Sequence, residues 1–523
     1  MFKNYLKVSL RNIVRHKGYS LINVASLSIG MTCCILMLLW VQDEISYDRF
    51  HKNADEIYRV VRETKIGGKK DHYSAAPNPT APLLKERYPE VIDAVRFRGG
   101  YTDWLVQYGE KSFLNDRLGV AGPSFFRVFK FPFVKGDPNT ALDHRQSVVL
   151  SESTAKKYFG REEPMDKVMK INTRDFKVTG IIKDVPHNSH MQFDLVVPVI
   201  NAHEWWGENP DDWNRDFELH TYILLDKNSS PEGLNQKIAG IVKEHRPTSD
   251  TRLYLQPLKD IYLYSSHLKY DNVGLGSITY VYIFSLIAFC ILLIGCINFM
   301  NLSTARSGIR AKEIGMRKIC GAHRTAIMKQ FFAESVIFSF IALLFAVLLV
   351  YLSLPAFNNL SGKQLTLFGG TGNLILILEL AVITFLTGMI AGSYPSLFLS
   401  SFQPVNVLKG ISRGGKLRGA YLRKLLVVLQ FTFMVVLIFG LIIIYNQLNF
   451  LKNKDLGFNK ENILYFWGQG NFVNQIDAVK NELLQNPDII AVSKSTPPIV
   501  ELMTTTDVDW EGRKPGESAA MSP

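Results

Sequence analysis

The chain has 523 residues, of which 47% are hydrophobic and 20% are charged, and its formal net charge is +12 at pH 7. A soluble protein could share its mean hydropathy of +0.06, and a nucleic-acid-binding protein could share its pI of about 9.2. The distribution of charge argues against that class, because the basic residues are divided among short segments beside long apolar runs.

The first eighteen residues predict an amphipathic helix. Apolar residues between Phe2 and Val14 recur at three- and four-residue steps, and four basic residues between Lys3 and Arg15 recur at steps of four on another face. A helix of this kind can lie on the anionic inner leaflet of a membrane. We therefore expect residues 1–18 to form a cytoplasmic surface helix.

Five runs of at least 21 residues are nearly free of charge. About 20 apolar residues in a helix cross a hydrocarbon core of about 30 Å, and lipid offers no partner to bare backbone groups. We therefore expect five transmembrane helices. The first is not a cleavable signal peptide, because acidic residues follow it instead of a small-residue cleavage site. The predicted spans are 20–42, 278–302, 331–357, 374–399 and 425–446.

The basic residues predict the orientation of these spans. Segments 1–18, 303–330 and 400–424 contain 18 of the 59 basic residues and one of the 47 acidic residues. Positively charged loops stay in the cytoplasm, and these segments alternate correctly with the spans. We expect a multi-pass protein with a cytoplasmic N-terminus. The segments expected outside are 43–277, 358–373 and 447–523.

Residues 43–277 predict a large mixed α/β domain. The segment SESTAKKYFG has a helical pattern that Ser151 can cap and Gly160 can terminate. Runs rich in β-branched and aromatic residues predict strands. These runs are Ser147–Leu150, Phe176–Ile182, Phe193–Val199, Thr221–Leu225 and Arg252–Leu258.

The same domain shows little catalytic or metal-binding chemistry. His187 and His190 lie in the turn-like sequence PHNSH without a third ligand nearby, and His144 has no recognisable ligand spacing. Paired carboxylates such as Asp211 and Asp212 are common on surfaces, and no GxSxG motif occurs. We expect a binding or force-transmitting domain, with no catalytic residue, no cofactor and no metal.

The most specific pattern is EIGMRKICGAHRTAIMKQFFAES, at 313–335. It closely resembles the cytoplasmic loop of MacB/FtsX-type ABC transporter permeases. The first 31 residues resemble that family's surface helix and first span. SVVLSESTAKKYFG and FKVTGIIKDVPHNSHMQFDLVVP resemble its extracytoplasmic core domain, and SYPSLFLSSFQPVNVLKG resembles the exit from its fourth span. The resemblance covers essentially the whole chain.

In that family the loop contains a coupling helix that docks on the ATPase subunit. We expect Gly315 to permit close approach to a partner protein, and Gly321 to adopt positive φ and end the helix. Cys320 stands where the family more often has an aliphatic residue. An alternative is that the loop only anchors the next span in the membrane interface. The resemblance implies the docking role for Glu313, Ile314, Gly315, Arg317, Lys318, Gly321 and Ala322.

The sequence contains no GxxxxGK[ST] phosphate loop. LSGKQ at 360–364 looks a little like an ABC signature motif, but it lies in a predicted outer loop that cytoplasmic ATP cannot reach. We therefore expect the ATPase to be a separate polypeptide.

The region 413–445 has the same pattern as the N-terminus, since a basic segment again precedes a span and a polar segment follows it. We expect an internally repeated architecture that is truncated in its second copy, within an eight-span whole. Glu379 is the acidic residue well inside the fourth predicted span. It is either functional or able to snorkel to the interface.

The predicted fold is an α-helical transmembrane bundle with a large mixed α/β extracytoplasmic domain. The resemblance implies a permease subunit in the bacterial inner membrane that couples ATP hydrolysis by a separate ATPase to movement of the outer domain, for export, efflux or lipoprotein release. The implied partners are an ABC ATPase, a second permease in a homo- or heterodimer, membrane lipid and a periplasmic adaptor, but not nucleic acid. The alternatives are an ATP-driven signalling complex that transports nothing and a receptor without an ATPase.

Overall fold

The protein forms two compact units. The membrane unit comprises Met1–Ile45 and Ile278–Lys460, and the α/β unit comprises Ser46–Ser277 and Glu461–Pro523. The computed structural model describes residues 11, 17–66, 69–101, 104–114, 116–205, 212–213, 219–269, 271, 276–305, 307–367, 373–401, 416–455, 462–464, 475–493, 506–508 and 519–521.

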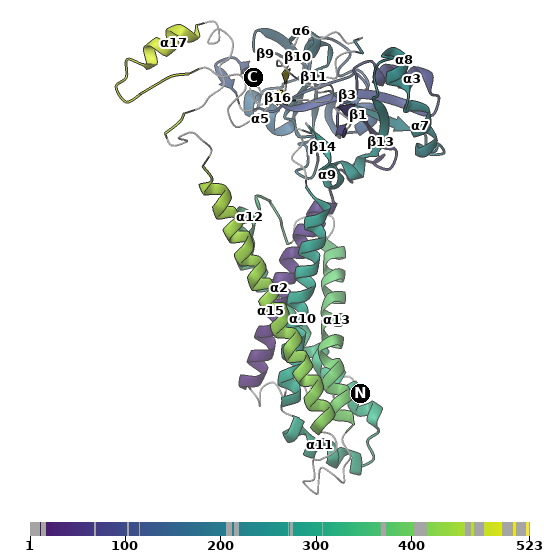
Figure 1. Cartoon of the computed structure of the whole chain (residues 1–523), viewed down its shortest axis with the longest axis vertical. Coiled ribbons are helices and arrows are strands. Elements are labelled where there is room, and N and C mark those ends of the chain that lie inside the picture. The colour runs from purple at the N-terminus through teal and green to yellow at the C-terminus, as the bar shows by residue number, and fades with distance from the viewer. Residues whose placement is uncertain are drawn as a thin grey trace. The chain divides into compact units, whose positions relative to one another are not determined.

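Five helices of the membrane unit are long and apolar enough to cross a membrane (Figure 1). Each contains one of the predicted apolar runs, as expected for segments whose backbone groups must be satisfied within the helix. The prediction of five apolar helices is therefore confirmed. They are α2 (Lys17–Ile45), α10 (Ile278–Ala305), α12 (Arg324–Ser361), α13 (Asn373–Ser400) and α15 (Lys416–Asn453).

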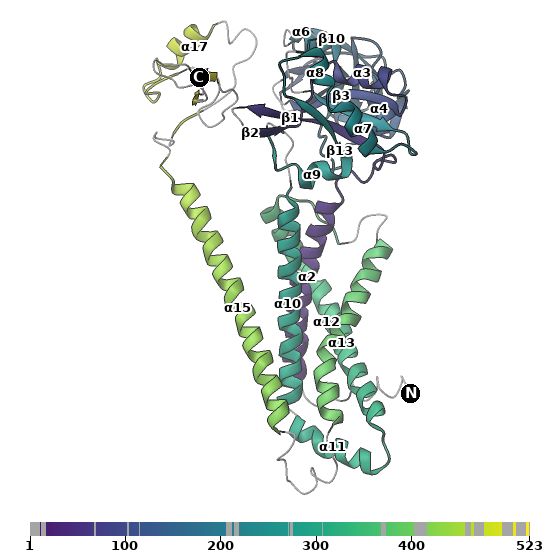
Figure 2. The ribbon, with the colours of Figure 1, turned by 45° about the vertical axis from the view of Figure 1, so that its right-hand side comes forward.

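Helices α2, α10, α12 and α13 share one apolar core, which includes Leu27, Phe299, Phe338 and Ala391. Helix α15 contacts α10 (Figure 2), but the most apolar part of α15 has no residue buried within the protein. The unit is thus a packed four-helix core with a fifth helix at its side.

Small residues bring α12 and α13 close together. A Cβ atom added at Gly388 would lie 2.7 Å from the Cα of Val336, and one added at Gly392 would lie 2.9 Å from the Cβ of Ser335. Close contact of this kind, together with hydrogen bonds between helices, stabilises bundles in lipid, where burial of apolar surface adds little.

The α/β unit is built on one strongly mixed sheet in the order β14-β2-β1-β12-β3-β6-β11-β8-β10-β9-β4-β5, with β13 paired to β1 and β7 paired to β10. Most pairs are antiparallel, whereas β8–β10, β6–β11 and β2–β14 are parallel. The strands are β1 (Ile57–Ile66), β2 (Lys69–Tyr73), β3 (Val91–Tyr101), β4 (Val106–Tyr108), β5 (Lys111–Phe113), β6 (Leu118–Ala121), β7 (Phe133–Gly136), β8 (Ser147–Ser151), β9 (Val168–Ile171), β10 (Arg174–Ile182), β11 (Leu195–Pro198), β12 (His220–Leu225), β13 (Arg252–Pro257) and β14 (Leu268–Lys269).

Short helices cover this sheet, and separate apolar clusters fill the spaces between helices and strands. One cluster is rich in phenylalanine around Phe125 and Phe193, and another lies around Tyr158 and Phe176. The helices are α3 (Thr80–Arg87), α4 (Phe125–Phe129), α5 (Glu152–Phe159), α6 (Ile200–Trp205), α7 (Pro231–Ile238), α8 (Ile241–His245), η1 (Leu258–Asp260) and α9 (Ile261–Tyr264).

The strand and helix predictions for this domain are confirmed. All five predicted strands correspond to strands of the sheet, namely β8, β10, β11, β12 and β13. Helix α5 has Ser151 as its N-cap, with the hydroxyl accepting from the N–H of Thr154 at 3.3 Å. It ends at Gly160, whose φ is +64°.

The predicted internal repeat is not confirmed. After α15 the structure describes short pieces, namely 462–464, 475–493 with α17 (Ile476–Leu483), β15 (Thr506–Val508) and β16 (Ala519–Met521). Most of the predicted surface helix at 1–18, and residues 402–415 of the predicted linker at 400–424, lie outside the described residues.

Candidate coupling site

Helix α11 (Ser307–Ile319) lies between α10 and α12 in the chain, in the segment predicted to dock on an ATPase subunit. Two backbone hydrogen bonds close its C-terminal end. The N–H of Ala322 donates to the carbonyl of Arg317 at 3.0 Å, and the N–H of Gly321 donates to the carbonyl of Lys318 at 3.1 Å. This is a Schellman motif, which favours glycine at the residue with positive φ. Gly321 has a φ of +92°, so the predicted helix end is confirmed.

An apolar contact attaches α11 to two membrane helices. Ile314 is 3% exposed and packs in a cluster with Ile327 and Phe331 of α12 and with Leu399 of α13. Ala322 packs against the same cluster. The side chains of this cluster are in direct contact, so α11 is packed against both helices.

Polar contacts strengthen this attachment. Arg317 donates to Glu313 at 2.6 Å and also to Gln330 of α12. The ammonium of Lys318 donates at 2.6 Å to the carbonyl of Ser400 at the end of α13, where helix carbonyls carry partial negative charge. Burial lowers the pKa of Lys318. The side chains of Arg317 and Lys318 therefore both have hydrogen-bond partners within the chain itself.

The structure changes which residues of α11 are available to another protein. Gly315 is buried within the chain beside Ile314, and its expected close approach to a partner protein stays a prediction. The residues that do face outward include Glu313, Met316 and Ile319, the last two each 57% exposed. Sequence reasoning missed Met316 and Ile319, although their three-residue spacing places them on one helix face.

A second charged cluster lies at the C-terminal end of α2. Lys363, in the loop after α12, forms ion pairs with Glu44 at 2.5 Å and with Asp43. Nearby in the chain, Gln42 donates to Glu379 of α13 at 2.5 Å. The lysine of LSGKQ thus holds the end of α2, and the half-buried Glu379 is hydrogen-bonded to α2. Neither partner was predictable from the sequence.

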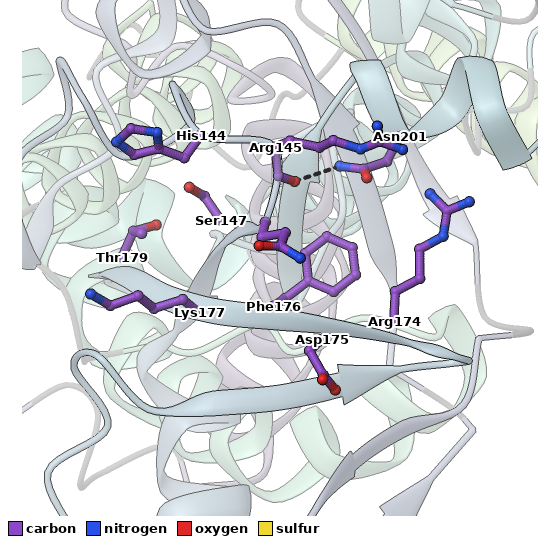
Figure 3. Close-up of a pocket in the computed structure, with 10 residues that line it drawn as sticks. His144, Arg145, Ser147, Arg174, Asp175, Phe176, Lys177, Thr179 and Asn201 are labelled. Carbon is purple, nitrogen blue, oxygen red and sulfur yellow. Dashed lines mark hydrogen bonds between the residues drawn. The ribbon is translucent and has the colours of Figure 1, made fainter.

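A hollow of about 680 Å³ in the α/β unit is lined by α6, β10 and the loop before β8 (Figure 3). Arg145, Arg174 and Lys177 line it together with Asp175. The amide of Asn201 donates to the carbonyl of Arg145 at 2.8 Å, which holds the loop against α6. These contacts serve the fold and present no combination of groups that points to a reaction.

The histidines considered from the sequence have structural surroundings. His144 lines the hollow, and His190 is buried against Asp48 and Tyr222. In the part of the chain that the structure describes, no group of three or more His, Cys, Asp and Glu residues is placed to hold a metal ion.

Comparisons with known proteins agree with this arrangement. Residues 20–241 match the MacB-like periplasmic core domain, and residues 285–404 match the FtsX-like permease C-terminal domain. The macrolide export ATP-binding/permease protein MacB of Mannheimia succiniciproducens is 22% identical over 77% of this chain and 60% of its own length. The MacB of Bdellovibrio bacteriovorus is 28% identical over 50% of this chain and 38% of its own. The chain spans about half the length of the curated relatives it matches.

Solved structures similar to this chain include the periplasmic region of MacB from Actinobacillus actinomycetemcomitans, with 16% identity, a TM-score of 0.31 and coverage of 40% of this chain and 91% of that one. The extracellular domain of the ABC-type transporter YknZ has 14% identity, a TM-score of 0.30 and coverage of 38% and 99%. On the two matched domains, which together span most of its length, the chain belongs to the FtsX-like ABC transporter permeases with a MacB-like periplasmic core domain.

Proposed function

We propose that this chain is the membrane subunit of an ABC transporter, and that it couples ATP hydrolysis by a separate cytoplasmic ATPase to movement of the α/β unit outside the membrane. One observation carries the proposal: α11 presents Met316 and Ile319 to solvent while Ile314 fixes its other side to α12 and α13. Exposed apolar residues on an otherwise polar segment are typical of interaction surfaces.

The residues of α11 divide into two roles in this proposal. Met316 and Ile319 contact the ATPase, and Glu313 lies at the rim of that contact with its partner Arg317. The remaining residues of the coupling site position the helix within the permease, and they are Ile314, Gly315, Lys318, Gly321 and Ala322. A shift imposed on α11 then reaches α12 and α13 through the Ile314 cluster and the contact between Lys318 and Ser400.

A binding experiment tests the docking face. The full chain in lipid nanodiscs is mixed with ABC ATPases encoded in the same genome, and bound ATPase and ATP turnover are measured. The double variant Met316→Glu/Ile319→Glu should lower ATPase affinity at least about tenfold, because two charges replace apolar contact area. Ile92→Glu is the matched control, because Ile92 is 53% exposed but lies on β3 of the α/β unit. Equal binding by all three proteins would show that α11 is only an interfacial anchor.

The proposed orientation places α11 in the cytoplasm and the α/β unit outside the inner membrane. Cys320 is exposed at the end of α11 and reports on this directly. A membrane-impermeant maleimide should label Cys320 in inside-out vesicles but not in intact cells, and Val168→Cys on β9 should show the reverse pattern in a Cys320→Ser background. Labelling of Cys320 in intact cells would contradict this topology.

Export, efflux or lipoprotein release is the activity that we propose for the complex, with a second permease chain and a periplasmic adaptor as partners. The alternative is an ATP-driven signalling complex without cargo. A transport measurement separates the two, because only the first releases a substrate or lipoprotein from membranes in an ATP-dependent way.

A further inference from the structure

The α/β unit buries a charged pair close to where the chain leaves it. Arg59 of β1 and Asp271 have side chains that are both 0% exposed. The guanidinium donates to the two carboxylate oxygens of Asp271 at 2.7 and 3.1 Å, and also to Gln256 and Ser265. In the sequence, Asp271 lies seven residues before Ile278, where α10 begins.

A similar polar contact holds the chain where it enters the unit from α2. Asp48 is fully buried, with a φ of +59°. One oxygen of its carboxylate lies 2.8 Å from Nδ1 of His190, and the other accepts from the N–H of His190 at 3.1 Å. Just before it, Ser46 accepts from the side-chain amide of Asn188 at 2.9 Å. These contacts fix the first residues after α2.

Strand β12 joins the two contacts. Nε2 of His190 lies 2.9 Å from the hydroxyl of Tyr222. His220 is two residues earlier, so it shares a face of β12 with Tyr222. Nε2 of His220 lies 3.8 Å from the carboxylate of Asp271. Burial, with Arg59 nearby, lowers the pKa of His220 well below its ordinary value, so Arg59 is the charge that balances Asp271.

A purely stabilising role does not account for this pair. Removing two charges from water costs several kcal/mol per ion, and apolar residues of similar volume often give equal or greater stability. What the pair does supply is one defined geometry, because a guanidinium and a carboxylate bonded through two atoms each permit little rotation. Among the described residues, strand β14, which precedes Asp271, pairs two residues with β2 and adds an ion pair between Lys269 and Asp71 at 2.8 Å, which is a short attachment.

We propose that one buried polar path fixes on the sheet the two chain crossings, which are the points after α2 and before α10 where the chain passes between the membrane unit and the α/β unit. A movement of α10 relative to α2 then displaces the α/β unit as one body. The path runs through Asp48, His190, Tyr222, His220, Asp271 and Arg59. This inference rests on the coupling function proposed above. The path carries the displacement to β1 and β12 in the interior of the sheet, and so protects the two-residue strand β14 from being pulled open.

Hydrogen exchange of the full chain in nanodiscs with its ATPase tests the path. The variant Arg59→Met/Asp271→Leu removes both charges at similar volume, so the α/β unit should stay folded and bind ATPase as before. We expect exchange at Leu268, Lys269 and β2 to rise about tenfold during ATP turnover, but not without ATP. The native chain should show no such rise.

Two further variants complete the test: one is a control outside the path, and the other interrupts the path at a second point. Arg117→Met/Asp194→Leu removes another two-point pair, with contacts of 2.8 and 3.1 Å, that precedes β6 and β11 and is partly exposed. It should cause no ATP-dependent exchange at Leu268, Lys269 and β2. Tyr222→Phe removes only the hydroxyl next to His190 and leaves the Arg59–Asp271 pair and the contact between Asp48 and His190 in place. It should raise exchange during turnover at Asp48, whose N–H donates to the carbonyl of Asn188 at 2.9 Å.

The outcomes separate this inference from the proposed function. A rise that is equal with and without ATP would show that the pair only stabilises the fold and would overturn the inference, as would native exchange in both variants of the path. A native chain that neither binds nor stimulates an ATPase would overturn the proposed function and the inference with it.

Discussion

The membrane unit and the α/β unit differ in where their ion pairs lie. In the membrane unit, the ion pairs lie at helix ends, as with Lys363 at the end of α2 and Arg317 at the end of α11. The helices themselves meet through glycine and serine. In the α/β unit, the Arg59–Asp271 pair lies in the interior, fully shielded from solvent. The two units thus obtain definite geometry by different means.

The difference follows from the two surroundings. Charge is expensive inside lipid, so close packing and short hydrogen bonds must hold helices together there. A water-exposed sheet has a sufficient apolar core for stability, and it can include a buried ion pair whose main contribution is a fixed arrangement. The following variants break or sharpen this comparison, from the largest expected effect to the smallest.

The single variant Arg59→Met should have the largest effect. It leaves the Asp271 carboxylate buried without its counter-charge, which costs about 3–5 kcal/mol of unfolding free energy. Urea unfolding of the α/β unit, followed in the full chain by the fluorescence of the partly buried Trp104 and Trp205, measures this. Arg59→Met/Asp271→Leu should recover most of the loss. A loss below about 1 kcal/mol in the single variant would mean that the pair is not strongly coupled.

Acid should destabilise the α/β unit through His51. Burial lowers its pKa to about 4, with Asp48 and the carbonyl of Phe129 acting in the opposite direction and His190 adding to the shift. The folded state therefore binds the proton less well than the unfolded chain. Stability should be complete above about pH 6.5 and fall by about 2–3 kcal/mol as the pH drops toward 4.

Unfolding free energies at pH 7 and pH 4.5 test this. His51→Phe should flatten the pH dependence, since a phenyl ring can occupy the aromatic surroundings of Phe129 and Phe131 without taking up a proton. The exposed His144→Gln is the control and should leave the dependence unchanged. An equally steep loss in His51→Phe would assign it to other groups.

Overpacking should separate the core helices from α15. Gly388→Leu forces a side chain against the backbone of α12, where an added Cβ is already 2.7 Å from Val336, and it should cost about 1–3 kcal/mol. Gly440→Leu on α15 meets no described atom within 4 Å and should be neutral. Thermal unfolding in detergent compares the two. Equal destabilisation would show that α15 packs as closely as α13.

The smallest effect is expected at Lys363. Lys363→Met removes the cation that contacts Asp43 and Glu44, whose side chains are only 8% and 4% exposed, and should cost about 1–2 kcal/mol. The control Lys177→Met removes a largely exposed pair with Asp166 and should cause no measurable change. Equal thermal unfolding temperatures for both variants would show that the Lys363 cluster is no stronger than a surface ion pair.

Much of the fold could be predicted from local signals. The apolar runs identify the five helices, and the β-branched runs identify β8 and β10–β13. Ser151 and Gly321 act within one turn of their own positions, so their roles as N-cap and helix end are readable from the sequence. The candidate site was predictable only in part, because a family pattern marks α11 but does not show which side of α11 is covered.

Sequence by itself determined the membrane class, the position of helix α11 and the mixed α/β character of the large domain, since hydropathy, strand propensity and caps depend on neighbours in the chain. The tertiary structure decided that Gly315 is buried while Met316 is exposed. It also decided that Lys363 holds the end of α2 and that Arg59 meets Asp271, 212 residues away. Burial and ion pairing are set by residues that are distant along the chain, and no local pattern records which of them meet.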